Sequence, residues 1–494
     1  MSTPPVVSLG VSAAGKEAVQ LAGMMNRHGL VAGATGTGKT VTLQVLAEGL
    51  SQIGVPVFTA DIKGDLSGLA EMGKTSPRLE ERLAATGILD HRFASFPVAF
   101  WDLFGQQGTP VRMTVSEMGP LVLARLLQLN DTQTGVLYAA FKIADDQGLL
   151  ILDLDDLRSL LTFVGEHAAE LKLTYGNLSA TSIGAIQRNL LVLDSQGASG
   201  VFGEPALALK DLMQVTPDGR GVINLLDATR LVSNSPDLYA CFLFWLLSEL
   251  FEELPERGDA EKPLLVLFFD EAHLLFRDTP KPLVDKIEQV VRLIRSKGVG
   301  VFFVTQSPLD VPPAILGQLG LKIQHALRAF TPREQKAVQV VAESFRANPG
   351  LNTASAITEL GTGEALISTL DAKGQPTPVE RVLIRPPGAQ IGPASAERRQ
   401  EIMEASVLHE RYARAINRES AHEKLTERAR ERIEAPTPPA PRETYEEAAA
   451  PRAPSRGRES AGEALVKSVL RAAGSQIGRQ IVRGILGSLL GGRR

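Results

Sequence analysis

One short segment near the start of the chain has the residues of a phosphate-binding loop. Residues 33–40 read Gly-Ala-Thr-Gly-Thr-Gly-Lys-Thr and match the pattern G-x-x-x-x-G-K-[ST] at every fixed position. Such glycines let backbone N–H groups wrap a phosphate, and the helix that follows adds the positive end of its dipole. We expect Lys39 to contact the β- and γ-phosphates and the Thr40 hydroxyl to bind Mg²⁺. The predicted cofactors are therefore ATP and Mg²⁺, and the predicted nucleotide-binding residues are Gly33, Ala34, Thr35, Gly36, Thr37, Gly38, Lys39, Thr40 and Val41.

A pair of acids follows an apolar run later in the chain. Residues 264–269 are all apolar, which is typical of a central strand buried on both faces, and Asp270 and Glu271 come directly after them. We expect Asp270 to join the Mg²⁺ shell and Glu271 to orient and polarise the attacking water. Many strands end in acids, but beside a P-loop this pair is typical of the Walker B motif of a hydrolase.

Three further groups of polar residues lie near these motifs in the sequence. Residues 299–305 predict another buried strand, and Gln306 at its end either contacts the γ-phosphate or the water, or simply faces solvent. Residues 61–65 (Asp-Ile-Lys-Gly-Asp) follow a predicted strand and form either a functional loop at the nucleotide crevice or a solvated turn. We expect His28 and His273 to be structural or to support the residues of the site, rather than to be catalytic.

The surrounding sequence predicts an α/β fold. An apolar strand over residues 30–32, a helix over 40–50 and a strand over 55–60 form one βαβ unit, and hence the start of a parallel sheet. Helical periodicity recurs over residues 114–213, which we interpret as an insertion. Later strands are expected over residues 222–226, 364–369 and 379–384, the last two as a hairpin.

We expect six parts along the chain. Residues 435–460 contain six prolines, and this composition predicts a linker without a core of its own. The expected parts are residues 1–113 (first part of the ATPase core), 114–213 (helical insertion), 214–394 (second part of the core), 395–434 (charged helical segment), 435–460 (linker) and 461–494 (basic tail).

Composition limits the cellular setting and the nature of any DNA contact. The 494 residues carry a net charge of −4, so any grip on DNA is expected from a local patch or a pore. Cys241 is the only cysteine, which excludes an intramolecular disulfide and fits a reducing compartment. We find neither a secretory leader nor an apolar run of about 18 residues, and therefore expect a cytoplasmic protein.

The combination of motifs resembles the HerA/FtsK superfamily of hexameric P-loop ATPases and, more narrowly, the bacterial HerA-like ATPases of the YjgR type. Walker motifs alone are shared by many ATPases, so the resemblance depends on their combination with Gln306 and Arg328. It spans about residues 6–386 and, for the narrower group, extends into the tail. The segments that carry it are residues 26–29 (Asn-Arg-His-Gly), 33–40, 61–65, 270–273, 298–300, 305–307 and 324–328.

The resemblance implies a RecA-like core and a homo-oligomeric, hexameric ring with nucleotide at the subunit interfaces. It suggests Arg328 as an arginine finger for a neighbour's site, on an edge strand expected over residues 323–330. Arg292, Arg295 and Arg333 remain alternatives. HerA itself carries a β-barrel before its P-loop, whereas 32 residues precede Gly33 here, which argues against a HerA-type role in DNA end resection.

Three functions are compatible with these motifs. The first is a ring-forming ATPase that translocates DNA, and the second is a non-motor ATPase that acts as a nucleotide-switched regulator or scaffold. The third, a monomeric nucleotide-binding protein, predicts no oligomer. The tail (residues 461–494) has six Lys or Arg and one Glu, and hence a net charge of +5. Its apolar residues at i, i+4 spacing, Ile477, Ile481, Ile485 and Leu489, predict a helix that docks on a protein partner, a sister subunit or an anionic membrane; an unordered tail is the alternative.

Overall fold

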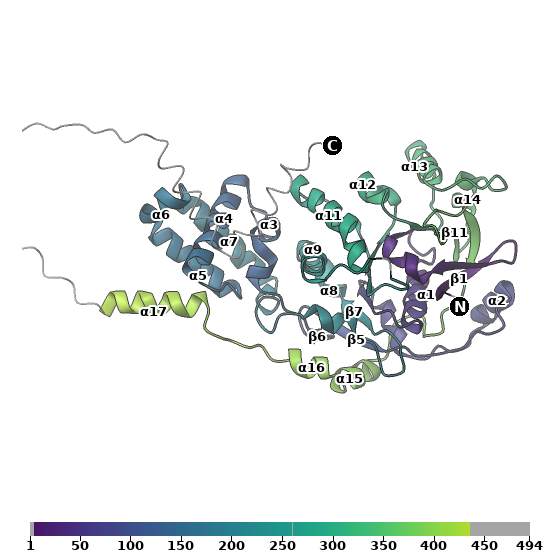
Figure 1. Ribbon diagram of the computed structural model, residues 1–494, viewed down its shortest axis with the longest axis horizontal. Helices are drawn as coiled ribbons and strands as arrows, with labels where there is room; N and C mark the ends of the chain where they lie inside the picture. The colour runs from purple at the N-terminus through teal and green to yellow at the C-terminus, as the bar shows by residue number, and fades with distance from the viewer. Residues whose placement is uncertain (1–3, 259, 435–494) are drawn as a thin grey trace, which may run out of the picture.

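The computed structural model describes residues 4–258 and 260–434, and its core is a twelve-stranded sheet (Figure 1). The strand order is β2-β1-β12-β11-β10-β3-β9-β8-β4-β7-β5-β6. The strands are β1 (Val6–Ser12), β2 (Glu17–Leu21), β3 (Gly29–Ala32), β4 (Val57–Asp61), β5 (Val98–Asp102), β6 (Thr109–Pro110), β7 (Ile223–Asp227), β8 (Leu265–Phe269), β9 (Val299–Thr305), β10 (Leu321–Gln324), β11 (Glu364–Ser368) and β12 (Glu380–Ile384).

The sheet has a parallel part and an antiparallel part. Every pairing from β10 to β6 is parallel, whereas the pairings that join β2, β1, β12, β11 and β10 are antiparallel. Every residue of β3, β4, β8 and β9 is buried, as parallel strands covered on both faces should be. Helix α1 (Lys39–Gln52) packs on one face, and α9 (Pro236–Glu253) and α11 (Lys281–Ile294) pack on the other. The predicted α/β fold with a mainly parallel sheet is confirmed.

Most strands expected from the sequence are present, and β11 and β12 form the expected antiparallel pair. The prediction of an edge strand over residues 323–330 is wrong. Strand β10 ends at Gln324 and lies inside the sheet, between β3 and β11. The reason is that β3 stops at Ala32, where the P-loop turns away, so residues beyond 325 have no strand to pair with on that side.

Five helices occupy the stretch in which the sequence predicts helical periodicity. They are α3 (Val115–Leu126), α4 (Asp131–Gln147), α5 (Leu154–Glu166), α6 (Ala168–Tyr175) and α7 (Ala180–Ser195), and Figure 1 shows them gathered to one side of the sheet. Capping boxes at Thr114, Asn130 and Asp153 start α3, α4 and α5. We call residues 115–195 the helical segment; the division of the chain into domains stays a prediction.

A C-terminal strap, residues 396–434, runs from the sheet to the helical segment (Figure 1). It consists of α15 (Ala396–Glu404), α16 (Val407–Tyr412) and α17 (Ala421–Glu434), which pack against β5, β6 and α5, respectively. Polar contacts hold it along its length: Arg399–Asp227 at 3.3 Å, Arg411–Asp211 at 2.5 Å, Arg418–Glu204 at 2.6 Å, and Ser420 Oγ to Asp156 Oδ1 at 2.5 Å.

Two expectations concern the chain beyond this core. The predicted linker and basic tail, residues 435–494, lie outside the described residues. Within residues 4–258 and 260–434, no helix combines the length and the apolar character that crossing a bilayer requires.

Cys241 is fully buried in α9, and burial raises the pKa of its thiol to about 12, as expected for an inert core residue.

Candidate nucleotide-binding and hydrolysis site

The loop between β3 and α1 has a conformation that requires its glycines. Gly33, Gly36 and Gly38 have φ angles of 154°, 78° and 114°, which lie in the region that favours glycine. A Cβ on Gly33 would lie 2.5 Å from Cβ of His325, so no side chain fits there. Gly363 N donates to Thr37 O, which ties the loop to the segment before β11. The P-loop is thus a backbone cradle at the carboxyl end of β3 that depends on its glycines.

Lys39 lies over this cradle at the start of α1. Its Nζ donates hydrogen bonds to Gly33 O at 2.5 Å and to Ala34 O at 3.1 Å. Burial lowers the pKa of Lys39, while Asp270 and Glu271 act in the opposite direction. Thr40 follows in the first helical turn and is partly buried.

The two acids of the predicted Walker B motif reach the same edge of the sheet. Strand β9 lies between β3 and β8, so Asp270 lies two strands from the P-loop. Burial raises the pKa of Asp270 to about 6, although the hydrogen bond from Glu271 N and the charges of Lys63 and Lys39 lower it. A buried carboxylate with a raised pKa gains from a bound cation.

Glu271 has an unusual backbone and an unsatisfied side chain. Its φ of 47° lies in the left-handed region, which is uncommon outside glycine and occurs at functional sites. Its Oε2 is buried and accepts no hydrogen bond, even though Nδ1 of His273 lies 3.2 Å away. An orphaned carboxylate oxygen of this kind fits the role of accepting a hydrogen bond from a water molecule.

Gln306 occupies the end of the intervening strand. It follows β9, which pairs with both β3 and β8, and its side chain is exposed. The strand end is fixed by Asp310, whose Oδ2 accepts from Thr305 Oγ1 at 2.6 Å and from Ser307 N at 3.1 Å. Gln306 therefore comes directly after the strand that lies between the two motifs, at the same edge of the sheet.

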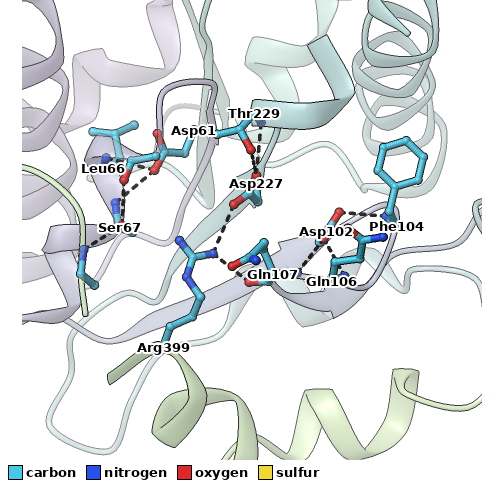
Figure 2. A network of polar contacts seen from close by, with 12 residues as sticks. Asp61, Leu66, Ser67, Asp102, Phe104, Gln106, Gln107, Asp227, Thr229 and Arg399 are labelled. Carbon is cyan, nitrogen blue, oxygen red and sulfur yellow. Dashed lines mark hydrogen bonds and ion pairs between the residues drawn. The ribbon is translucent and has the colours of Figure 1, made fainter. Parts of the chain in front are cut away.

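The carboxyl ends of the next strands carry a row of aspartates (Figure 2). Asp61 ends β4 and its Oδ2 accepts from Leu66 N and Ser67 N, so it caps the turn that follows. Burial, with a further contribution from Asp227, raises the pKa of Asp61 to about 6. Asp227 ends β7 and binds Arg399 of the strap, and Asp102 ends β5. Sequence reasoning missed Arg399, because nothing in the local sequence links residue 399 to β7.

The arginines considered for a trans role lie in two different places. Arg328 is exposed on a loop that lies beside the P-loop of the same subunit, because Ala34 N of the P-loop donates to Ala326 O. Arg292 and Arg295 instead line a cavity of about 510 Å³ together with Arg27, at the opposite edge of the parallel strands. Lys322 and Arg346 also line this cation-lined cavity, and no Asp or Glu is among its described lining residues.

The P-loop after β3, the two acids after β8 and the polar end of β9 between them, in a mainly parallel sheet covered by helices, define a P-loop ATPase with a RecA-like fold. The chain belongs to the Helicase HerA-like C-terminal family, whose model matches residues 7–494. Narrower membership in the YjgR-type group stays a prediction.

The individual proteins to which the chain is similar have low sequence identity or match only part of the chain. A probable helicase of Methanocaldococcus jannaschii is 32% identical over 125 residues, which cover 24% of this chain and 22% of that protein. The chain thus matches about a fifth of that relative's length. The plasmid coupling protein TrwB in complex with a non-hydrolysable GTP analogue is similar in fold, with a TM-score of 0.50, 16% identity and coverage of 80% of this chain and 92% of TrwB. VirB4 of Thermoanaerobacter pseudethanolicus has a TM-score of 0.47, 15% identity and coverage of 81% and 99%.

Proposed function

We propose that this chain is a Mg²⁺-dependent ATP hydrolase. The observation that carries the proposal is the meeting, at one edge of the sheet, of the P-loop after β3 and the acids after β8. The residues there fit both ligands: the glycine-rich loop and Lys39 lie at the N-terminus of α1, and Asp270 is a buried carboxylate with a raised pKa. The site therefore supports binding of Mg-ATP.

In this proposal each residue has a defined task. Backbone N–H groups of residues 33–40 and the ammonium of Lys39 hold the phosphates, and Thr40 and Asp270 hold Mg²⁺. A Mg²⁺ ion held there would supply neutralisation of the charge on the phosphate oxygens. Glu271 orients a water molecule and accepts its proton, and Gln306 contacts the γ-phosphate or that water.

We also propose that the subunits form a hexameric ring, in the cytoplasm, with nucleotide between neighbours. A head-to-tail interface, which generates rings, can bring the amino edge of one sheet against the carboxyl edge of the next. The cation-lined cavity is at the amino edge, so in this arrangement it would face a neighbour's phosphates. This supports Arg292 as an alternative to Arg328 for the arginine finger.

The finer proposal is that the ring uses hydrolysis to move DNA. The experiment measures ATP turnover with and without duplex DNA, at salt concentrations between about 50 and 200 mM, because contacts to phosphates weaken steeply over that range. Lys39→Ala serves as the hydrolysis-dead control. We expect duplex DNA to raise turnover at low salt and to do so less at high salt. A wild-type protein that neither binds nor hydrolyses ATP would contradict the whole proposal.

A second candidate is a non-motor ATPase that regulates a protein or a membrane-associated partner. It is favoured by the net charge of −4 on the chain, together with the basic tail of residues 461–494. For this candidate, turnover is unaffected by DNA at any salt concentration. Sedimentation of the protein with and without ATP tests the ring separately, since a monomer under both conditions contradicts it.

A further inference from the structure

A buried arginine of the helical segment reaches the turn that follows Glu271. Arg125 lies in the last turn of α3 and is 8% exposed. Its Nη2 donates to Leu274 O at 3.2 Å, and its Nη1 is 3.4 Å from Leu275 O. Both carbonyls belong to α10 (His273–Phe276), which begins two residues after Glu271. Arg125 therefore joins the helical segment to the Walker B turn.

Helix α10 is short and is held at both ends. Ala272 N, just before it, donates to Val304 O of β9 at 2.9 Å. Carbonyls in the last turn of a helix lack partners within the helix, and arginine side chains can satisfy them. Leu274 N donates to Glu271 O at 2.9 Å, so a displacement of α10 acts directly on the backbone of Glu271. That backbone is the one held at φ 47°.

A groove lies beside Arg125, although the side chains of Arg125, Leu274 and Leu275 are themselves buried. A groove of about 650 Å³ separates the end of α3 from the segment after α10, and Arg125, Gln128, Leu274 and Asp278 are among its lining residues. Gln128 and Asp278 have φ angles of 51° and 53°, again in the left-handed region. The guanidinium adds a polar contact between α3 and α10 to the packing of α10 on α9. Leu275 O also accepts from Thr279 Oγ1 at 2.7 Å, so Leu274 O is the carbonyl that depends most on Arg125.

We propose that Arg125 is a positioning residue for hydrolysis, which sets the orientation of Glu271 through α10 and thereby makes turnover depend on the placement of the helical segment. The inference rests on the proposed ATPase function. Arg125 is not part of the P-loop, which lies two strands away from β8. Its loss should therefore lower kcat and leave nucleotide binding intact, the behaviour of an interaction that acts on the chemical step.

The experiment compares three variants of the full chain. Arg125→Met keeps an apolar stem and removes every donor, whereas Arg125→Lys keeps a charge that cannot form the two-pronged contact. Arg158→Met is the matched control, because Arg158 lies in α5 and pairs with Asp155 and Asp194 instead. For each variant, kcat and KM for ATP are measured, and hydrogen exchange of residues 272–278 is followed without nucleotide.

We expect Arg125→Met to lower kcat by about tenfold or more, with KM within about twofold of wild type. Exchange should rise in residues 272–278 and stay unchanged in β8 and β9. Arg125→Lys should be intermediate in both readouts, and Arg158→Met should match wild type. In a Glu271→Gln background, Arg125→Met should add little further loss, because the group that it positions is already absent.

Two results would overturn the inference. One is raised exchange of residues 272–278 with unchanged kcat, which means that α10 does not act on Glu271. The other is a parallel loss of kcat and nucleotide affinity, with raised exchange throughout the chain, in both Arg125 variants, which means a general structural role. A wild-type protein that does not hydrolyse ATP would contradict the proposed function rather than this inference. In that case, hydrogen exchange of residues 272–278 alone tests whether Arg125 holds the turn.

Discussion

The ammonium group of Lys39 donates a hydrogen bond of 2.5 Å to the carbonyl oxygen of Gly33, the first residue of its own loop. A phosphate in the loop competes for the same donor and, as an anion, forms the stronger, charge-assisted bond. Nucleotide binding therefore replaces the hydrogen bond from Lys39 to Gly33 O with one from Lys39 to a phosphate. The side chain of Lys39 is already placed above the loop before the nucleotide arrives.

The first prediction concerns this lysine. Lys39→Ala should abolish hydrolysis and weaken ATP binding by about tenfold or more, because it removes the charge that contacts the β- and γ-phosphates. Calorimetric titration with Mg-ATP and a phosphate-release assay measure the two effects. Lys16→Ala, at an exposed turn between β1 and β2, should match wild type. Unchanged turnover in Lys39→Ala would rule out the P-loop as the site of hydrolysis.

The second prediction separates binding from chemistry. Glu271→Gln should bind Mg-ATP as tightly as wild type and hydrolyse it about 10²–10⁴-fold more slowly, because the amide keeps the shape of the side chain but cannot accept a proton. Single-turnover measurements with a separate binding assay test both statements. Wild-type turnover in this variant would mean that another group activates the water.

The third prediction follows from the protonation of Asp270. Burial raises its pKa from 3.8 to about 6, so the folded state binds this proton more tightly than the unfolded chain does. The free energy of unfolding of the metal-free protein should therefore fall as pH rises through this window. Below about pH 6, Mg²⁺ must also displace the proton, and the Asp270 contribution to apparent Mg²⁺ affinity should fall about fourfold between about pH 7.5 and 5.5.

Asp270→Asn is the control for this pH dependence, since ATP itself takes up a proton in the same range. The variant should retain only the part of the dependence that comes from ATP, and its unfolding free energy should change less between about pH 4 and 6. Identical pH profiles for the variant and wild type would show that Asp270 is not the group that titrates.

The fourth prediction tests the arginine finger. A trans finger contributes about 10³–10⁵ in turnover, so Arg328→Ala or Arg292→Ala should each be inactive if that residue is the finger. Mixing the inactive variant with Lys39→Ala should restore partial activity, because some interfaces then pair an intact P-loop with an intact finger. If the Arg328→Ala protein is fully active, Arg328 is not the arginine finger. Likewise, a fully active Arg292→Ala protein excludes Arg292.

The fifth prediction concerns the tail. Deletion of residues 461–494 should leave ATP turnover within about twofold of wild type, because no part of the P-loop or Walker B motif lies there. If the tail docks on an anionic membrane, the deletion should also abolish cosedimentation with vesicles that contain phosphatidylserine. Loss of both folding and hydrolysis would show instead that the tail belongs to the core.

The sequence predicts the centre of the molecule well because its signals are local. A glycine pattern, an apolar run and a helix of ordinary periodicity each specify their own structure, so β3, α1, β8 and β9 are placed within one or two residues. The strand expected over residues 323–330 was wrong for a non-local reason. Its apolar residues satisfy strand propensity, but the end of a strand depends on where its neighbour stops, and β3 stops at Ala32.

The contacts around the site could not be predicted for the same reason. Arg399 binds Asp227 across 172 residues of sequence, and Arg125 reaches Leu274 across 149. Neither arginine belongs to a motif, and a charged residue on a helix is normally read as a solvated surface. Only the folded sheet shows that Asp61, Asp102 and Asp227 stand at the same edge.

The strap changes the mechanics of the molecule. The chain enters the helical segment after β6 and returns to the sheet at β7, and α3 of this segment packs on α9. Helix α17 adds a further point of attachment at α5, away from the sheet (Figure 1). Its contacts include buried ones: Ser420 Oγ donates to the fully buried Asp156, and Leu408, Tyr412, Ala421 and Leu425 belong to the main hydrophobic core. The strap therefore acts as a built-in brace, which ties the ATPase sheet and the helical segment together through apolar as well as polar contacts.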